Sequence, residues 1–346
     1  LVTGQKSGSG WIDADIHVDK VGLYVEGAVT PKVYDFALFG DPASIVVSGG
    51  NNQSATVNTA FALPLEVTVT DLYGNPVSGA AVTFTAPVSG ASATFTPVNG
   101  IATTDASGKA SVLATANTVA GGYSVTATVG LFNTTFSLTN TAGAAAAMTI
   151  TGGNNQSAVV LTAFAVPLEV TVTDSFSNPV SGVLVTFTAP VSGASATFTP
   201  ANGEDTTDAA GKASVIATAN GTAGAYSVGA AAGALNASFS LTNTFGAPAT
   251  LVVSGGNNQS ATVNTAFALP LEVTLTDANG NPVSGATITF TAPVSGASAA
   301  FTPVNGQAVT DASGKASVLA TANTVAGGYS VTAAIGAVNT TFSLTN

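Results

Sequence analysis

Apolar and polar side chains alternate along one stretch of the chain, residues 64–84, and that stretch occurs three times. It reads PLEVTVTDLYGNPVSGAAVTF and returns with few changes from Pro167 and from Pro270. The segment LEVTVT alternates with a period of two, which is typical of a strand with one buried face. The GNP that follows predicts a tight turn, because Gly and Asn tolerate a positive φ and Pro fixes its own φ. Each copy is therefore expected to form a strand, a turn and a second strand.

The three copies stand 103 residues apart (167 − 64 and 270 − 167). A fixed period of this length indicates an array of domains, and a unit of about 100 residues can bury its own core. We expect three repeats, residues 43–145 (repeat 1), 146–248 (repeat 2) and 249–346 (repeat 3). The links between them, near 141–143 and 244–246, are only a few residues long. Such short links favour an extended and fairly stiff rod.

Within repeat 1 the alternation and the turn signals predict seven short strands. They lie near residues 44–48, 63–71, 80–86, 93–96, 109–116, 123–129 and 134–139. No stretch shows a helical period with caps at its ends. Short strands separated by frequent turns predict an all-β chain built of sandwiches.

Residues 1–42 differ from the repeats and contain the only tryptophan and the only histidine. The sequence from Gly22, GLYVEGAVTPKVYDFALF, is similar to the last strands of repeat 1, GGYSVTATVGLFNTTFSLTN. We interpret residues 1–42 as a partial, divergent β segment that lacks the first half of its sandwich. The missing strands would come from an upstream portion of a longer chain or, by strand exchange, from another subunit.

Composition narrows the function. Charged residues make up 7% of the 346 residues, arginine is absent and the formal net charge is −11. This balance argues against nucleic acid and anionic lipid as partners, which require clustered basic residues. No run approaches 18 apolar residues, so no membrane insertion is expected within this chain. There are no cysteines, so the cores rather than disulfides must stabilise the repeats.

A set of motifs now carries a family resemblance over residues 43–346. EVTVTDxxGNPVSGxxVTFTAP is followed by ATFTP, TTDASGKASVLATA and AGGYSVTA. Together they resemble the bacterial immunoglobulin-like (Ig-like) domains of the invasin and intimin type, group 1. The resemblance implies tandem Ig-like β-sandwiches of a kind that forms the stalks of prokaryotic surface adhesins and other extracellular arrays. It also implies that Tyr123, Tyr226 and Tyr329 are corner tyrosines whose hydroxyls bond to backbone.

Acidic residues recur before the turns, with Asp71, Asp174 and Asp277 as one set and Asp105, Asp208 and Asp311 as another. They suggest either calcium sites or turn caps in which Asp accepts hydrogen bonds from nearby backbone amides. Calcium needs six to eight oxygen ligands, and no dense acidic cluster occurs in the repeats. We therefore favour turn capping and predict no cofactor. The turn residues to which we assign a structural role are Asp71, Asn75, Pro76, Asp174, Asn178, Pro179, Asp277, Asn281 and Pro282.

The N-terminal segment carries the one group of side chains with metal-ligand chemistry, Asp13, Asp15, His17 and Asp19. In a strand these four would share one face. However, residues two apart on a flat strand lie about 7 Å from each other, which is too far for one ion to bridge several of them. They are weak candidates for a metal site, and a solvated or aggregation-resistant strand face explains them better.

The sequence contains few residues that could carry out catalysis. The single histidine has no nucleophile motif near it. Glu66, Glu169 and Glu272 supply one carboxylate per repeat where glycoside hydrolysis needs two. The lysine that occurs once in each repeat, on a neighbouring strand, is the simpler partner for this glutamate. We predict that the chain is not an enzyme.

The leading hypothesis is a non-enzymatic extracellular structural protein that forms a filament or a surface-layer subunit. Residues 1–42 would allow head-to-tail polymerisation by strand complementation, so that the main partner is another copy of the chain. The alternative is the stalk of a cell-surface adhesin whose binding tip, for a host or neighbouring cell, lies outside this chain. A third hypothesis, an accessory array of a polysaccharide-degrading enzyme, is weakened because the aromatic Tyr73 and Phe176 become Asn279 in repeat 3. All three place the chain outside a prokaryotic cell or on its surface.

Overall fold

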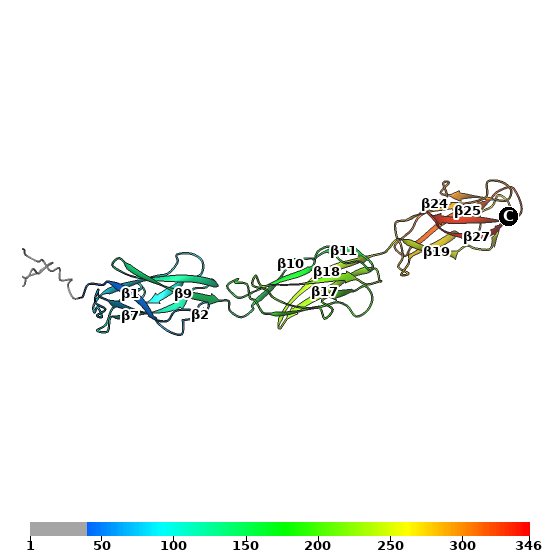
Figure 1. The fold of residues 1–346 in the computed structure, drawn as a ribbon. Coiled ribbons are helices and arrows are strands. Elements are labelled where there is room, and N and C mark those ends of the chain that lie inside the picture. Colours follow the sequence, from blue (N-terminus) through cyan, green and yellow to red (C-terminus); the bar gives the residue numbers. More distant parts are fainter. Residues whose placement is uncertain (1–39) are drawn as a thin grey trace, which may run out of the picture. The chain divides into compact units, whose positions relative to one another are not determined.

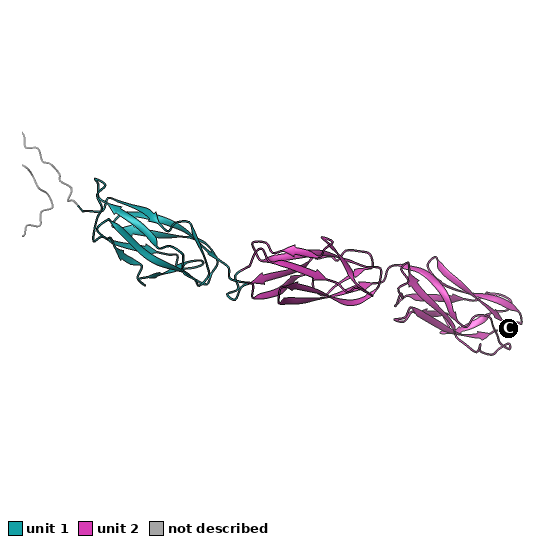
Figure 2. Cartoon of the chain, turned by 90° about the horizontal axis from the view of Figure 1, so that it is seen from below, with its two compact units in different colours: residues 1–144, 174–178 teal, residues 145–173, 179–346 magenta. Residues whose placement is uncertain are grey.

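The computed structural model describes residues 40–346, and in that part of the chain it forms strands and no helix. The predicted partial β segment lies outside the described residues except for its end, as do Asp13, Asp15, His17 and Asp19. The chain divides into two compact units (Figure 2). The first runs to Ala144 and includes Asp174–Asn178, and the second comprises Ala145–Thr173 and Pro179–Asn346.

Repeat 1 contains nine strands where the alternation predicted seven. Their bounds are β1 Ser44–Gly49, β2 Gln53–Thr56, β3 Leu65–Thr70, β4 Ala81–Thr85, β5 Ala93–Thr96, β6 Ile101–Thr103, β7 Lys109–Ala116, β8 Gly121–Val129 and β9 Phe132–Thr141. Every predicted strand is present. The two additional strands, β2 and β6, have four and three residues and bury no large apolar side chain.

Repeats 2 and 3 contain the same nine strands in the same order. In repeat 2 they are β10 Ala147–Gly152, β11 Gln156–Val159, β12 Leu168–Thr173, β13 Leu184–Thr188, β14 Ala196–Thr199, β15 Glu204–Thr206, β16 Lys212–Ala219, β17 Gly224–Ala232 and β18 Leu235–Thr244. In repeat 3 they are β19 Pro248–Gly255, β20 Gln259–Ser260, β21 Leu271–Asp277, β22 Thr287–Thr291, β23 Ala299–Thr302, β24 Gln307–Val309, β25 Lys315–Ala322, β26 Gly328–Ile335 and β27 Val338–Thr345.

Each repeat is a sandwich of two sheets (Figure 1). In repeat 1 one sheet has the order β1-β3-β7-β5 and the other has the order β2-β9-β8-β4-β6. The pairs within the sheets are antiparallel except for β2 and β9, which run parallel with Gln53 opposite Leu138 and Thr56 opposite Thr141. The prediction of an all-β chain of Ig-like sandwiches is therefore confirmed.

The stretch 64–84 that defines the repeat links the two sheets. Its first strand, β3, pairs with β1 and β7, whereas its second strand, β4, pairs with β6 and β8 in the other sheet. The two strands alternate as the sequence predicts, because the apolar face of each must point into the space between the sheets. The turn at 71–75 therefore lies where the chain crosses from one sheet to the other.

The core of each repeat lies between its two sheets. Leu65, Val67 and Val69 of β3 are completely buried and meet Phe84 of β4 and Phe136 of β9. The rings of Phe84 and Phe136 have centroids 6.0 Å apart, a spacing at which aromatic pairs attract beyond their buried area. Repeats 2 and 3 have separate cores of the same residue types. Each sandwich thus has its own source of hydrophobic stability.

Close packing of backbone fixes one glycine in each repeat. Gly50 follows β1 with a φ of 75°, and a Cβ built on it would lie 2.1 Å from the carbonyl oxygen of Pro64. No other residue fits both that conformation and that approach. This accounts for the second glycine of the GGNNQS sequence, which occurs at the end of the first strand in each repeat.

Candidate functional site: the Asp–Asn turns

A turn that begins with Asp and ends four residues later with Asn follows β3, β12 and β21, and we call it the Asp–Asn turn (71–75, 174–178 and 277–281). In repeat 1, Asp71 Oδ1 accepts hydrogen bonds from the backbone N–H of Tyr73 at 2.9 Å and of Asn75 at 2.8 Å. Asn75 Nδ2 donates to Asp71 Oδ2 at 3.1 Å. The turns at Asp174 and Asp277 have the same internal bonds.

The turn of repeat 3 also bonds to the end of repeat 2, within the second compact unit. Asn281 Nδ2 donates to the carbonyl oxygen of Gly221 at 2.9 Å, and Asn281 Oδ1 accepts from the N–H of Ala223 at 2.8 Å. Asp277 Oδ2 accepts from the N–H of Gly246 at 2.8 Å. Two side chains thereby satisfy three backbone groups that lie outside their own turn.

The turn 174–178, which belongs to the first compact unit, has the same set of bonds. Asn178 donates to the carbonyl oxygen of Thr118 at 2.9 Å and accepts from the N–H of Ala120 at 2.8 Å. Asp174 Oδ2 accepts from the N–H of Gly143 at 2.8 Å. The pattern is therefore a repeated arrangement of this chain.

Burial of these side chains strengthens the bonds, because buried polar groups have no water to replace a lost partner. Asp277 is 2% exposed and Asn281 is 7% exposed. Burial acts to raise the pKa of Asp277, but hydrogen bonds from Asn281 and from the N–H of Gly246 outweigh it, so the pKa lies below its ordinary value. The same causes lower the pKa of Asp174. Both carboxylates are ionised hydrogen-bond acceptors at neutral pH.

Two glycines lie in van der Waals range of the turn side chains, at distances that a Cβ would tolerate. A Cβ built on Gly246 would lie 3.5 Å from Asp277 Oδ2, and one on Gly221 would lie 3.5 Å from Asn279 Oδ1. In the turn 174–178 the residue that corresponds to Gly221 is Thr118, and Phe176 stands in place of Asn279. The backbone bonds are therefore the same whether the two positions are occupied by Thr118 and Phe176 or by Gly221 and Asn279.

The turn of repeat 1 differs in its surroundings. Asn75 is exposed, whereas Asn178 and Asn281 are buried. Among the described residues, the Asn75 side chain bonds only to Asp71. A hydrogen bond from the Asn75 amide lowers the pKa of Asp71.

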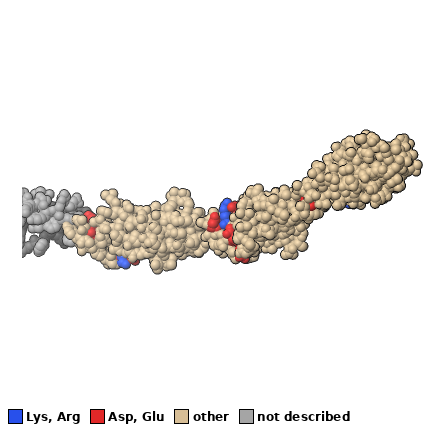
Figure 3. Space-filling model, turned by 45° about the vertical axis from the view of Figure 1, so that its right-hand side comes forward, with Lys and Arg blue, Asp and Glu red and all other residues tan. Residues whose placement is uncertain are grey.

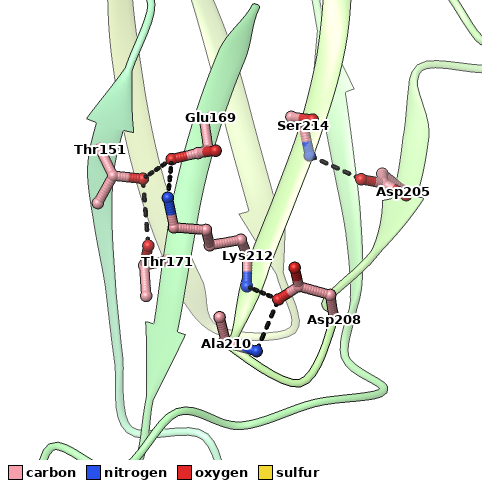
Figure 4. A network of polar contacts seen from close by, with 8 residues as sticks. All are labelled: Thr151, Glu169, Thr171, Asp205, Asp208, Ala210, Lys212 and Ser214. Carbon is pink, nitrogen blue, oxygen red and sulfur yellow. Dashed lines mark hydrogen bonds and ion pairs between the residues drawn. The ribbon is translucent and has the colours of Figure 1, made fainter.

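A second recurring polar contact joins neighbouring strands on the surface of each repeat. Lys109 Nζ lies 2.8 Å from Glu66 Oε1, and Lys212 and Glu169 form the same pair (Figure 4). Lys315 and Glu272 form the third pair. The prediction that the repeat lysine is the partner of this glutamate is confirmed.

The expected bond of the corner tyrosines is wrong. The hydroxyls of Tyr123, Tyr226 and Tyr329 are buried and have no hydrogen-bond partner among the described residues. The rings pack against the cores from the start of β8, β17 and β26, and this packing buries the hydroxyls. Burial raises the pKa of all three tyrosines to about 12.

The other aspartate set lies at exposed turns. Asp105 Oδ1 accepts from the backbone N–H of Ser107 and of Lys109, and Asp311 accepts from Ser313 and Lys315 in the same way. Residues 40–346 contain no group of three or more His, Cys, Asp or Glu side chains arranged to hold a metal ion. They also contain no helix long and apolar enough to cross a membrane.

Two features of the site were not evident in the sequence. The residues that bond to the Asp–Asn turns from the preceding repeat, 118–120 and 221–223, offer only backbone groups, and backbone groups leave no residue-type signal. The glycines at 143 and 246 were recognised only as short links. Figure 3 shows that one face of the described chain carries few charged side chains.

The comparisons with known proteins agree with this architecture. Residues 46–139 match the family model of the bacterial Ig-like domain (group 1). The inverse autotransporter adhesin YeeJ of Escherichia coli strain K12 is 33% identical over 292 residues, which cover 81% of this chain and 12% of that protein. The chain therefore spans only a small part of that relative's length.

Two solved structures share the fold. The E. coli adhesin FdeC has a TM-score of 0.57 at 19% identity and covers 90% of this chain and 100% of its own. InvD of Yersinia pseudotuberculosis has a TM-score of 0.52 at 18% identity, covering 85% of this chain and 95% of its own. The cell-surface location predicted from the sequence is confirmed by this relationship to surface adhesins. Repeat 1 is therefore a bacterial Ig-like domain of group 1, and repeats 2 and 3 share its motifs and sheet order.

Proposed function

We propose that this chain is a non-enzymatic spacer in the stalk of a bacterial cell-surface adhesin, with the binding tip outside these residues. The observation that carries the proposal is the buried Asp–Asn turn that bonds repeat 3 to the end of repeat 2. A spacer needs domains that fold independently and junctions that limit their relative motion. The separate cores supply the first property, and the turns supply the second.

The junction is suited to a permanent contact within one chain. Asn281 and Asp277 are buried, and removing either would leave backbone groups of Gly221, Ala223 or Gly246 without their protein partner. A contact of a few hydrogen bonds cannot hold two free molecules together, because association costs several kcal/mol of lost motion. A short covalent link removes most of that cost, since the second domain is already at a high effective concentration.

The surface of the repeats supports a spacer more than a receptor-binding role. Most described positions outside the cores are Thr, Ser, Asn, Gly and Ala, and no repeated aromatic platform is present because Tyr73 and Phe176 correspond to Asn279. Protein-binding sites are enriched in clustered aromatic and arginine side chains, and this chain has no arginine. The relative YeeJ is named an adhesin. We assign this chain to the stalk of such a protein and not to its binding tip.

Small-angle X-ray scattering of the full chain tests the proposal. We expect one maximum dimension that does not change with protein concentration. The double substitution Asp277→Ala and Asn281→Ala is expected to shorten the average dimension and to broaden its distribution, because repeats 2 and 3 then move independently. The matched control, Asn99→Ala at an exposed loop, should leave the scattering unchanged. Identical curves for the wild type and the double variant would contradict the spacer proposal.

A second candidate function, a filament subunit, rests on residues 1–42 and their similarity to the last strands of repeat 1. If these strands complete the sandwich of a neighbouring copy, the scattering mass increases with concentration. Deleting residues 1–39 would abolish that increase while the three repeats stay folded. A constant molecular mass at all concentrations would contradict the filament.

A further inference from the structure

The Asp–Asn turn of repeat 1 has the same internal geometry as the two Asp–Asn turns that form hydrogen bonds to a preceding repeat. Asp71 and Asn75 make the three bonds within their turn that Asp277 and Asn281 make in theirs. The bonds do not depend on a neighbour, because they close within five residues. The turn is therefore formed in advance of any docking partner.

The bonds that reach outward are the ones repeat 1 lacks. Asn281 Oδ1 and Nδ2 and Asp277 Oδ2 each bond to backbone of the preceding repeat or link. In repeat 1, no described residue outside the turn bonds to the side chain of Asn75 or Asp71. Asn75 is exposed, although its two counterparts are buried.

The link ahead of repeat 1 also corresponds to the links that take part in docking. Gly40 stands 103 residues before Gly143, and Gly143 stands 103 residues before Gly246. The sequence around the first link, FGDPAS, is close to FGAPAT at the last. A Cβ built on Gly143 or Gly246 would lie 3.5 Å from an aspartate oxygen, but one built on Gly40 meets no described atom within 4 Å. Repeat 1 therefore has the parts of the contact, and its Asp71 and Asn75 side chains bond to no described residue outside the turn.

We propose that the Asp–Asn turn at 71–75 is a docking site for the loop end of another Ig-like repeat, held next to it by a short link at Gly40. This rests on the proposed spacer function and identifies the kind of partner that continues it. The partner must offer a backbone carbonyl and, two residues later, a backbone N–H, as Gly221 and Ala223 do. The loop of repeat 3 that corresponds to 221–223 contains Thr324 and Ala326 at those two places, so repeat 3 is a suitable probe.

An enlarged chain tests the site directly. A copy of residues 246–346, followed by Thr-Phe, is inserted between Phe39 and Gly40, so that the inserted repeat precedes repeat 1 through a natural link. Because the protein has no cysteine, single spin labels can be placed at chosen positions without removing native residues. One label replaces the copied Val294 and the other replaces Leu131, both of which are exposed in the parent repeats. The distance distribution between the labels is then measured by pulsed electron paramagnetic resonance.

We expect a narrow distribution that Asn75→Ala converts into a broad one, with loss of the narrow component. The matched native pair, with labels at Val191 and Ala337, should be narrow with or without Asn75→Ala and should broaden with Asn281→Ala. Thermal unfolding of Asn75→Ala should equal that of the parent, which separates docking from folding. A distribution that is equally broad with and without Asn75 would overturn the docking site while a narrow 191–337 pair leaves the spacer function standing. Association of separate, unmodified chains that Asn75→Ala abolishes would instead overturn the requirement for a linked repeat.

Discussion

The core of a repeat and its Asp–Asn turn are built on opposite principles. The core contacts are closed within one sandwich: Val228 and Phe239 of repeat 2 are completely buried against residues of the same repeat. The turn has bonds within itself and bonds to a neighbour, and only the latter differ between Asn75 and Asn281. Core residues therefore determine whether a repeat folds, while the turn determines whether one repeat is ordered relative to the next. The division lets stability and inter-repeat order change independently.

The largest expected effect is in the core. Phe239→Ala removes a fully buried ring that packs against Phe187 in a tilted arrangement with centroids 6.0 Å apart, and it should cost repeat 2 about 3–5 kcal/mol. Calorimetry should show a separate, lower transition for repeat 2 while the other repeats unfold as before. Val191→Ala, at a fully exposed position, is the control and should have no such effect. Equal destabilisation of all three repeats would break the comparison, because it would mean that the cores are not independent.

A smaller effect is expected at the turn. Asp277→Ala leaves the buried N–H group of Asn281 and the partly buried N–H group of Gly246 without their acceptor, and it should cost about 1–3 kcal/mol in repeat 3. Asp71→Ala removes the same internal acceptor but no bond to a preceding repeat, so its destabilisation of repeat 1 should be smaller. Urea unfolding followed repeat by repeat measures both. If the two substitutions cost the same, the bond to Gly246 contributes nothing.

Alkaline pH, combined with a substitution at the tyrosine, tests the edge of the core. Burial raises the pKa of Tyr226 to about 12, above its value in the unfolded chain. The folded state therefore favours the protonated hydroxyl, and its contribution is present below about pH 10 and is lost as the pH rises through the folded value. Tyr226→Phe should keep the neutral stability, because that hydroxyl has no described partner, and should reduce the alkaline loss in repeat 2. A large loss of stability at pH 7 would indicate a hydrogen bond that these contacts lack.

The smallest effect is expected at the surface ion pair. Glu169→Gln removes the charge that faces Lys212 at 2.8 Å, but both side chains are partly solvated and such pairs contribute little. The unfolding midpoint of repeat 2 should shift very little. In high salt, which screens the ion pair, the shift should be smaller still. Ser214→Ala, on the same strand as Lys212, is a suitable neutral control. A shift as large as that of Asp277→Ala would mean that the ion pair contributes as much to stability as the Asp–Asn turn does.

Alternation and the turn signals were sufficient to predict an all-β chain of sandwiches, and the family resemblance supplied the Ig-like type. LEVTVT and KASVLATA show their period because every second side chain is buried between the sheets, and β3 and β7 lie where the pattern places them. β2 and β6 were missed because neither buries a large apolar side chain, whereas β5, which is also short and at a sheet edge, buries Phe95.

The site was predictable only in part. Asp71 and Asn75 were identified as turn residues because their side-chain chemistry suits a turn. The partners of Asn281 are backbone groups of Gly221 and Ala223, which no residue type specifies. The tyrosine hydroxyls were wrongly expected to bond to backbone because family resemblance gives a position in the fold but not the atoms around it. In both cases the surrounding tertiary structure determines which hydrogen bonds form, and the sequence pattern does not contain that information.

The parallel pairing of β2 with β9 has a mechanical consequence. The chain enters repeat 1 near β1 and leaves it at the end of β9, while β2 runs in the same direction as β9 over four paired residues. Tension on the two ends of the repeat pulls these parallel strands past each other, so their hydrogen bonds are loaded together instead of opening one after another. A further bond from the N–H of Val57 to the carbonyl oxygen of Thr141 extends the loaded region. Repeat 2 has the same pair in β11 and β18, so a pull along the chain meets this resistance in each of these repeats in turn.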